Sequence, residues 1–286
     1  MSWDQLLAPG VTVRDSPLET DRFGCSFQRL TIGPGPLKPD DLLAMIEDLR
    51  ADVLVIRYDA ARLEIPGTLA RSRRAVLPAG TLTYWEKPVS AAGPPEPSSP
   101  EMLPAAEPPE PSDLEVVSAA TLDLETVSTV VREIVRASFR DYGNHYTANP
   151  LLDRAAALAG YEDWAVRSLG SDPDNVLVLV EGAIPIGMAT LEPGSDGDHL
   201  EILLAGLVPA AQGRHLYDGL LDGCERAALT RGATRIVIST QVHNVRVQRA
   251  WARHCLRPFA AIETVHLVGR HLLAPPARSG PKPLAW

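Results

Sequence analysis

The sequence predicts an α+β fold in which a mixed sheet is flanked by helices and preceded by a smaller, partial α/β module. Three observations lead to this prediction. The second half of the chain alternates strand-like apolar runs with amphipathic stretches in an order that suits one mixed sheet. One run, HLEILLAGLV at residues 199–208, is apolar almost throughout, which indicates burial on both faces. A proline-rich acidic segment separates this half from the first 86 residues.

The first part, residues 1–86, reads as a small N-terminal module. Residues 28–33 and 51–59 have the composition of strands, and residues 81–88 have that of a further strand. Between the first two, residues 39–50 begin with Pro-Asp and space their leucines and isoleucine like one face of a helix. No metal or nucleophile spacing occurs here, so we expect a structural or oligomerisation unit.

Residues 87–112 are rich in proline, serine and acidic side chains, and they lack apolar periodicity. Such a segment cannot bury enough surface to offset its ordering entropy, so we expect an extended linker. The next domain is predicted to span residues 113–270, followed by a tail at residues 271–286. Its strands are expected at 114–118, within 175–192 as a hairpin turning at Glu181-Gly182, and at 199–208, 235–240 and 262–268. Its helices are expected at 123–139, 154–168, 213–230 and 245–254.

Composition narrows the class of protein. The chain has 286 residues, of which 45% are apolar and 22% charged, as in ordinary globular proteins. The net charge of −9 argues against a nucleic-acid partner. No apolar stretch approaches the roughly 20 residues that span a bilayer, and the first residues lack the pattern of a signal peptide, so we expect a cytoplasmic protein without membrane contact. Three widely spaced cysteines suggest neither a disulfide framework nor a metal site.

The turn between the buried strand and the next helix carries the clearest chemical signal. A strand that enters a tight loop and then a helix N-terminus presents unpaired backbone N–H groups and the positive end of a helix dipole, which suits a pyrophosphate. Gly213 allows close approach of a ligand, and Gln212 and Arg214 add donors. Many strand-to-helix turns contain a glycine and bind nothing, so this signal alone is weak.

The loop Gln212-Gly213-Arg214-His215-Leu216-Tyr217 resembles the pyrophosphate loop of the GNAT acyltransferase superfamily. That loop reads Gln or Arg, two residues, Gly, any residue, then Gly or Ala, so His215 and Tyr217 replace small residues. The segments TQVHNVRVQRAW at 240–251 and FRDYGNHYTANPLLDRAAALAGYEDWAVRSL at 139–169 are similar to the TDP-fucosamine acetyltransferase-like branch of that superfamily. This branch also carries a partial N-terminal module, so the likeness covers the chain apart from the linker and the tail.

The resemblance implies an acetyl-CoA or other acyl-CoA donor and a small-molecule amine acceptor. The backbone at Leu207 and Val208 would pair with the pantetheine arm, residues 212–217 would hold the pyrophosphate, and Asn244 would hydrogen-bond the arm. As a structural alternative, Asn244 simply caps a helix. Seven residues later, where the superfamily usually has an acidic tyrosine, this chain has Trp251, which cannot donate an acidic proton. Tyr217 and His254 are possible substitutes.

Proton removal from the attacking amine needs a base, for which the sequence offers several candidates. His145 and Tyr146 belong to the segment expected on the acceptor side, and His266 lies within the last strand. Glu201 and His243 are further candidates, and a water chain is another. A surface or hydrogen-bonded structural role is the alternative for each.

The resemblance implies N-acylation of an amino group on a nucleotide-linked amino sugar or a related biosynthetic intermediate. Other acceptors remain open, namely a free amino acid or an aminoglycoside, because fold-level analogy is a poor guide to substrate. A second class of function is a binding or structural module that has lost its chemistry, and a third is transfer from a carrier-protein thioester. The sequence also leaves open whether the chain forms a homodimer.

Overall fold

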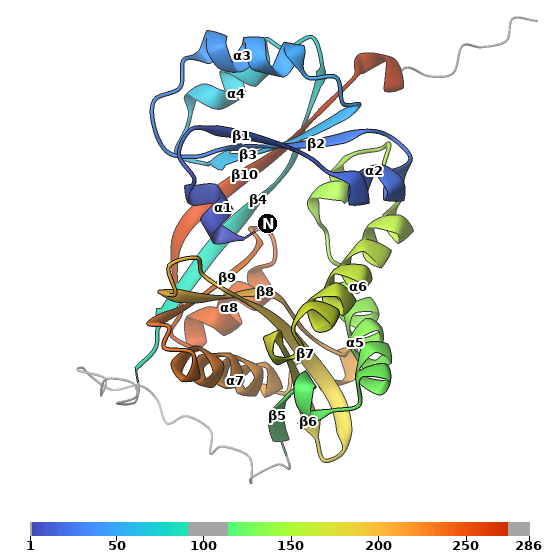
Figure 1. Cartoon of the computed structure of the whole chain (residues 1–286), viewed down its shortest axis with the longest axis vertical. Coiled ribbons are helices and arrows are strands. Elements are labelled where there is room, and N and C mark those ends of the chain that lie inside the picture. The colour runs from blue at the N-terminus through green and yellow to red at the C-terminus, as the bar shows by residue number, and fades with distance from the viewer. Residues whose placement is uncertain (1, 91–113, 274–286) are drawn as a thin grey trace, which may run out of the picture.

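The structure is a computed structural model and describes residues 2–90 and 114–273. Within these residues the strands form one mixed sheet of ten, in the order β1-β2-β3-β10-β4-β9-β8-β7-β6-β5 (Figure 1). The strands are β1 (Val11–Asp15), β2 (Phe27–Ile32), β3 (Val53–Asp59), β4 (Ala75–Pro88), β5 (Leu114–Ser118), β6 (Val176–Glu181), β7 (Ile184–Pro193), β8 (His199–Leu207), β9 (Arg235–Gln241) and β10 (Arg257–Val268). The predicted mixed sheet flanked by helices is confirmed.

The N-terminal end of the sheet is a small α/β unit. β2 and β3 run parallel and are joined through α3 (Pro39–Asp48), and β1 pairs antiparallel with the outer edge of β2. As the periodicity predicts, α3 begins at a proline and buries Leu42 and Ile46. α4 (Glu64–Leu69) packs beside α3. The sequence did not predict α4, nor the short helices α1 (Trp3–Leu7) and α2 (Pro17–Phe23).

The C-terminal end has helices on both faces of the sheet. β5 to β8 form an antiparallel meander, and β9 lies parallel to β8. α5 (Leu124–Phe139) and α6 (Arg154–Ser171) cover one face, and α7 (Leu216–Thr230) covers the other, with α8 (Val245–Arg253) beside it. Short 3₁₀ turns complete this part, among them η2 (His145–Ala148) between α5 and α6. In the described residues no helix is long and apolar enough to cross a bilayer.

A β-bulge interrupts β8 in its middle. The register with β7 shifts between Leu191↔Ile202 and Thr190↔Leu204, so Leu203 is the extra residue. The side chains follow this shift, since Ile202 packs in the core under α7 while Leu204 packs in the core under α5 and α6. The bulge thus shifts the alternation of side chains by one residue, so that Ile202 and Leu204 lie on opposite faces of the sheet.

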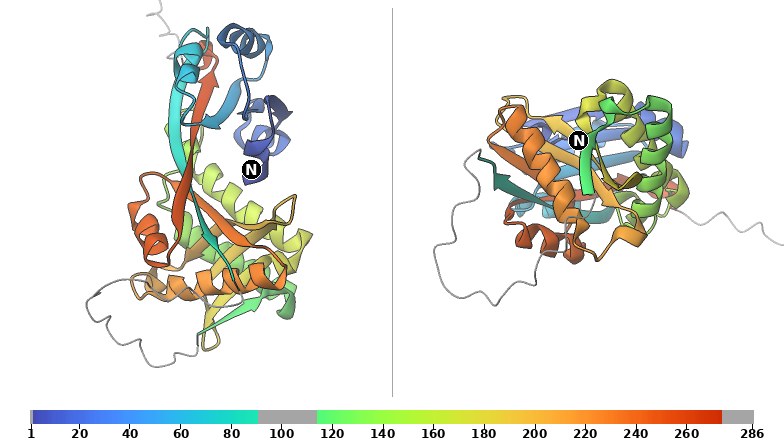
Figure 2. Two further views of the ribbon diagram at one scale, coloured as in Figure 1. Left: turned by 90° about the vertical axis from the view of Figure 1, so that its left-hand side faces the viewer. Right: turned by 90° about the horizontal axis from the view of Figure 1, so that it is seen from below.

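Two long strands join the ends of the sheet into one structure. β10 lies between β3 and β4, and β4 pairs in turn with β9. Figure 2 shows these strands running from the N-terminal end of the molecule into its C-terminal part. The last strand, expected in the C-terminal domain, therefore completes the sheet of the N-terminal module, and the sheet has no break at the predicted domain boundary. The predicted linker and tail lie almost entirely outside the described residues.

The parallel strands β8 and β9 separate after a short contact. They pair only from His199↔Arg235 to Ile202↔Ile238, so residues 203–207 of β8 have no partner on β9. The bulge at Leu203 marks the point of separation. The opening between the two strands leads directly to the loop before α7.

Candidate functional site

A cavity of about 930 Å³ fills the opening between β8 and β9 and continues under the N-terminal module. Its wall includes residues 201–207 of β8, residues 238–241 of β9, and the loop before α7. From the N-terminal module it includes Glu19, Arg29, Arg57 and Tyr84. This volume lies within the range of small-molecule binding sites, which span roughly 300–1,000 Å³.

The loop before α7 presents a row of free amide groups. Gly213 has φ 79° and His215 has φ 61°, both in the left-handed region. Among the described residues, the backbone N–H groups of residues 213–217 have no hydrogen-bond acceptor in the protein. The positive end of α7, which begins at Leu216, lies at the same place. This cradle of N–H groups therefore fits a pyrophosphate.

Gln212 fixes the loop against the neighbouring elements. Its Nε2 donates to the carbonyl of Leu207 at 2.9 Å, and its Oε1 accepts from Arg246 Nη1 at 3.0 Å. Ser138 Oγ donates to the same carbonyl at 2.9 Å. Leu207 lines the cavity, whereas Val208 donates its N–H back to Ile186 of β7. Of this predicted pair, only Leu207 is thus part of the cavity wall.

The side chains of the loop point in different directions. Arg214 forms two hydrogen bonds with Glu181 and does not belong to the cavity wall, so only its backbone can serve the cradle. The imidazole of His215 is 73% exposed. Tyr217 is packed inward, and Trp251 Nε1 lies 3.4 Å from its hydroxyl. The two bulky residues of the loop therefore leave its amide row open.

Asn244 and Trp251 both line the cavity from the β9–α8 side. The Asn244 amide donates to Thr240 Oγ1 at 3.0 Å and makes no capping bond to α8, so a simple capping role does not explain it. Trp251 is 1% exposed and packs edge-on against Trp85. Burial raises the pKa of Tyr217, while His254 lies outside the cavity wall. Tyr217 is thus the hydroxyl beside Trp251.

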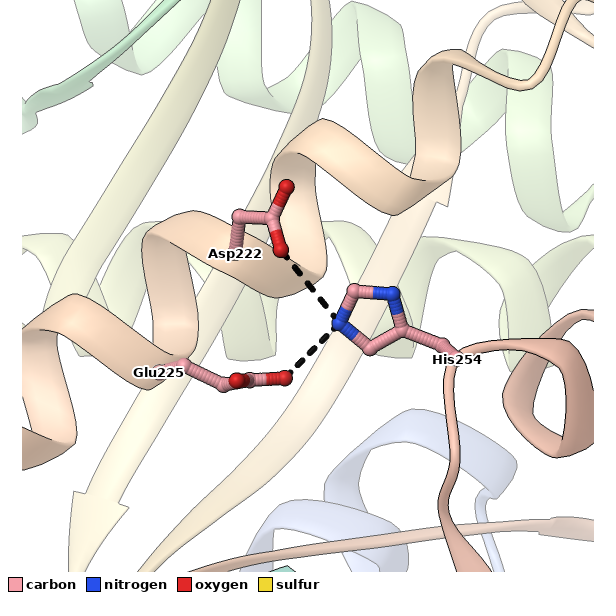
Figure 3. Close-up of side chains that lie close together, drawn as sticks. All are labelled: Asp222, Glu225 and His254. Atoms are coloured by element: carbon pink, nitrogen blue, oxygen red, sulfur yellow. Dashed lines mark hydrogen bonds and ion pairs between the residues drawn. The ribbon is translucent and has the colours of Figure 1, made fainter. Parts of the chain in front are cut away.

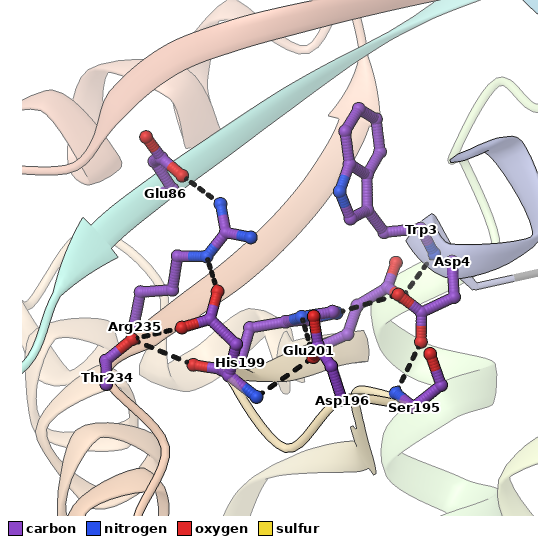
Figure 4. A network of polar contacts seen from close by, with 10 residues as sticks. Trp3, Asp4, Glu86, Ser195, Asp196, His199, Glu201, Thr234 and Arg235 are labelled. Atoms are coloured by element: carbon purple, nitrogen blue, oxygen red, sulfur yellow. Dashed lines mark hydrogen bonds and ion pairs between the residues drawn. The ribbon is translucent and has the colours of Figure 1, made fainter. Parts of the chain in front are cut away.

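Glu201 is a buried carboxylate on β8 that lines the cavity. Burial raises its pKa to about 7. Its Oε2 accepts the backbone N–H of Trp3 at 2.6 Å, and in the same network Asp4 accepts the N–H of Ser195 (Figure 4). A carboxylate with a pKa near neutrality is well suited to remove a proton from a substrate.

The predicted residues His145, Tyr146 and His266 come together on one buried face. His145 Nδ1 lies 2.9 Å from His266 Nε2, and Asn149 Nδ2 lies 3.2 Å from His266 Nδ1. Burial lowers the pKa of His145 well below its usual value and that of His266 to about 4. His145 and Tyr146 line the cavity, but His266 does not. His243 lies beside Gly143, also outside the cavity wall.

Two arginines of the N-terminal module enter the same face. Arg29 donates two hydrogen bonds of 2.7 Å to Glu19, whose Oε1 also accepts the Tyr146 hydroxyl at 2.6 Å. Arg57 on β3 is 7% exposed. Sequence reasoning missed both arginines and Glu19. A signal was present, since Arg57 and Glu201 are each charged residues within otherwise apolar strands, and such residues are seldom buried without a reason.

A separate cluster on the surface joins Asp222, Glu225 and His254. His254 Nε2 lies 2.7 Å from Glu225 Oε1 and 3.5 Å from Asp222 Oδ1 (Figure 3). The Lys87 ammonium donates to the same Glu225 oxygen at 2.6 Å. A lysine of β4 therefore supplies a cation beside Glu225, and the cluster ties α7 to β4 and to the end of α8.

A mixed sheet whose central parallel strands separate over an amide-lined loop defines the GNAT acetyltransferase fold. Comparison with known proteins agrees, since residues 131–255 match the acetyltransferase (GNAT) family. A GCN5-related N-acetyltransferase from Sphaerobacter thermophilus is similar with a TM-score of 0.57 and 13% identity, over 90% of this chain and 76% of that one. One from Kribbella flavida has a TM-score of 0.51 and 11% identity, over 87% and 83%.

A glucosamine N-acetyltransferase region of a fungal multi-domain GH3 β-N-acetylglucosaminidase is also similar. Its TM-score is 0.51 and its identity 10%, over 84% of this chain and 30% of that chain. No curated protein matches the sequence. At these identities the likeness establishes the fold and leaves the acceptor to be argued from the cavity.

Proposed function

We propose that this protein is an N-acyltransferase that moves an acetyl or other short acyl group from an acyl-CoA to an amine. The observation that carries the proposal is the continuity of one cavity from the amide cradle at residues 213–217 to the Glu201 carboxylate. The cradle has unpaired N–H groups for a diphosphate, and the far end has a base for an amine.

In the proposed reaction, each group of residues has its own role. The loop and Asn244 hold the donor, and the open edge of β8 at residues 203–207 directs it toward Glu201. Glu201 removes a proton from the ammonium group of the acceptor, whose nitrogen then attacks the thioester carbonyl carbon as the C–S bond breaks. The thioester supplies an activated acyl group. A thiolate leaves with little help because a thiol pKa is about 8.5, which agrees with a tryptophan at position 251.

The acceptor that we propose is the amine of an amino sugar, nucleotide-linked or otherwise charged. Support comes from the sequence resemblance at residues 139–169 and 240–251. The cavity continues under the N-terminal module, which agrees with an acceptor larger than a simple alkylamine.

Calorimetric titration with acetyl-CoA tests the donor site. We expect micromolar binding by the natural chain and its loss in Gly213→Val, since φ at this residue is 79° and a β-branched side chain would force the backbone of the cradle to shift. Gly232→Val is the matched control, because Gly232 has φ 75° and equally open surroundings at the opposite end of α7. Release of free thiol with a set of amines then measures turnover. Absence of binding at millimolar acetyl-CoA would remove the proposed donor.

A further inference from the structure

We propose that the hydroxyl of Tyr142 donates a hydrogen bond to the carbonyl oxygen of the bound thioester, where negative charge develops during acyl transfer. The inference rests on the proposed function and adds a residue to its site. Tyr142 lies in the segment between α5 and η2, and it lines the cavity. Its ring packs edge-on against Phe139 and Tyr161, with ring centroids 5.5 and 6.3 Å away, so it is held from the side of α5 and α6.

The Tyr142 hydroxyl lies at the edge of β9 from which β8 has separated. Within the described sheet, β8 and β9 stop pairing at Ile238, and the later residues of β9 pair only with β4. Val242 donates its N–H to Thr81 of β4, so the N–H of Gln241, one residue earlier, points to the opposite edge of β9. That N–H donates to the Tyr142 oxygen at 3.2 Å. The hydroxyl therefore occupies the opening between the two strands.

The hydrogen bonds around Tyr142 leave one hydroxyl proton for a ligand. Thr240 Oγ1 accepts the Asn244 amide at 3.0 Å and lies 3.4 Å from the Tyr142 oxygen. The two hydroxyls have two protons and share one contact, so one proton finds no acceptor among the described residues. Thr240 is 4% exposed, whereas Tyr142 is only half-buried at the cavity wall. The spare proton is therefore assigned to Tyr142.

This hydroxyl suits a ligand atom that accepts a hydrogen bond. With Thr240 donating to it, the Tyr142 oxygen accepts two hydrogen bonds, the second from Gln241, and has no further lone pair to offer. It is therefore a poor partner for the ammonium group of the acceptor. The two accepted hydrogen bonds also strengthen the O–H as a donor, because neighbouring hydrogen bonds polarise one another.

The carbonyl oxygen of the thioester gains most from such a donor. When the amine nitrogen attacks, an electron pair of the C=O bond moves to the oxygen, and it returns as the C–S bond breaks and sulfur leaves as a thiolate. A donor already in place stabilises this transient charge without reorganisation. The sulfur needs less help, since a thiol pKa is about 8.5. Asn244, which we place beside the pantetheine arm, is joined to Tyr142 through Thr240, so the hydroxyl lies near the reacting end of that arm.

Infrared spectroscopy of bound acetyl-CoA, isotope-labelled at the acetyl carbonyl, tests this inference without an amine and so without turnover. A hydrogen bond to the oxygen weakens the C=O bond, so the carbonyl band should lie at higher frequency in Tyr142→Phe than in the natural chain. With the fastest amine of the thiol-release set, Tyr142→Phe should lower kcat about tenfold to a hundredfold and change the Kd of acetyl-CoA less than about threefold. Tyr58→Phe is the matched control, since Tyr58 is buried in the core beside α3 and does not line the cavity.

The position of the carbonyl band decides between a contact with the oxygen and other roles of Tyr142. An identical band in the natural chain and in folded Tyr142→Phe would overturn the inference even if kcat falls, because the hydroxyl would then act elsewhere. An unchanged kcat would overturn it as well. If melting curves show that Tyr142→Phe does not fold, the double variant with Thr240→Val replaces it, since removing both partners leaves neither hydroxyl unpaired. Failure of acetyl-CoA to bind the natural chain would instead overturn the proposed function.

Discussion

Trp3 donates its backbone N–H to the Glu201 carboxylate over 2.6 Å, which links the first helix to the central strand β8. The Trp3 ring is held by Tyr84 and Phe259, with ring centroids 4.9 and 4.8 Å away. The N-terminal helix thus covers the carboxylate to which the mechanism assigns proton removal. Burial is the largest cause of the raised pKa of Glu201. By burying the carboxylate, the helix therefore helps to raise this pKa to about 7.

The first prediction concerns the base itself. Glu201 must be ionised to accept a proton, so kcat/KM for the amine should rise about tenfold per pH unit below a pKa of about 7 and level off above it. Glu201→Gln should lower kcat by about a hundredfold or more and remove this limb. Glu115→Gln is the control, since Glu115 is an exposed glutamate of β5 that does not line the cavity. An unchanged pH profile in Glu201→Gln would assign the base elsewhere.

Trp3→Ala should move the rising part of the pH profile of kcat/KM toward lower pH. The substitution releases α1 from Tyr84 and Phe259 and lets water reach Glu201, which weakens the main cause of its raised pKa. The measurement is the pH dependence of kcat/KM. Leu7→Ala serves for comparison, because Leu7 lies on the same helix but is 48% exposed. A limb that stays in place would show that α1 does not control the carboxylate.

Arg246 and Arg214 should contribute differently to donor binding. Arg246 lines the cavity and bonds to Gln212, whereas Arg214 is engaged by Glu181 on the outside of the loop. We expect Arg246→Gln to weaken acetyl-CoA binding about tenfold and to reduce its salt dependence, and Arg214→Gln to change it less than about threefold. Calorimetry at two salt concentrations checks both values. The reverse order would place the phosphates on the other side of the loop.

His266 should make stability depend on pH. Its pKa is about 4 in the folded protein against about 6.5 in an unfolded chain, so the unfolded state binds more protons between these values. Its contribution is therefore present above about pH 6.5 and is lost as the pH falls toward 4, by up to about 3 kcal/mol. In His266→Gln this loss disappears, so the difference in unfolding free energy between the two proteins should shrink with acid. Urea unfolding at several pH values measures it, and a constant difference would contradict the prediction.

The local elements of the second half could be predicted because their signals are local. The apolar runs of β6, β7 and β8 and the amphipathic α5 all follow from residues close in sequence. The helices α1, α2 and α4 were missed because five to seven residues give too little periodicity. Strand β4 begins at Ala75, whereas the sequence predicted a strand only from residue 81. The first half of β4 was missed because it contains proline and glycine, which are rare in strands.

The candidate site was only partly predictable for a different reason. The loop at residues 212–217 is continuous in sequence, so its composition pointed to an anion site that the structure supports with unpaired amides. Arg29, Arg57 and Glu19 come from β2, β3 and α2, and only the pairing of β10 with β3 and β4 brings them over the same cavity. Strand pairing over some 200 residues depends on tertiary packing, which periodicity does not report. The roles of His145, Tyr146 and His266 stay predictions.

The position of β10 has a consequence for how the chain acquires its shape during synthesis. β3 emerges from the ribosome first, yet the strand that covers its inner edge is made only after about two hundred further residues. Until then β3 and β4 each expose unpaired backbone N–H and C=O groups. Such an edge pairs readily with strands of other chains, which leads to aggregation. The N-terminal part of the sheet is therefore completed last. Because β3 and β10 are far apart in sequence, we expect their pairing to be slow.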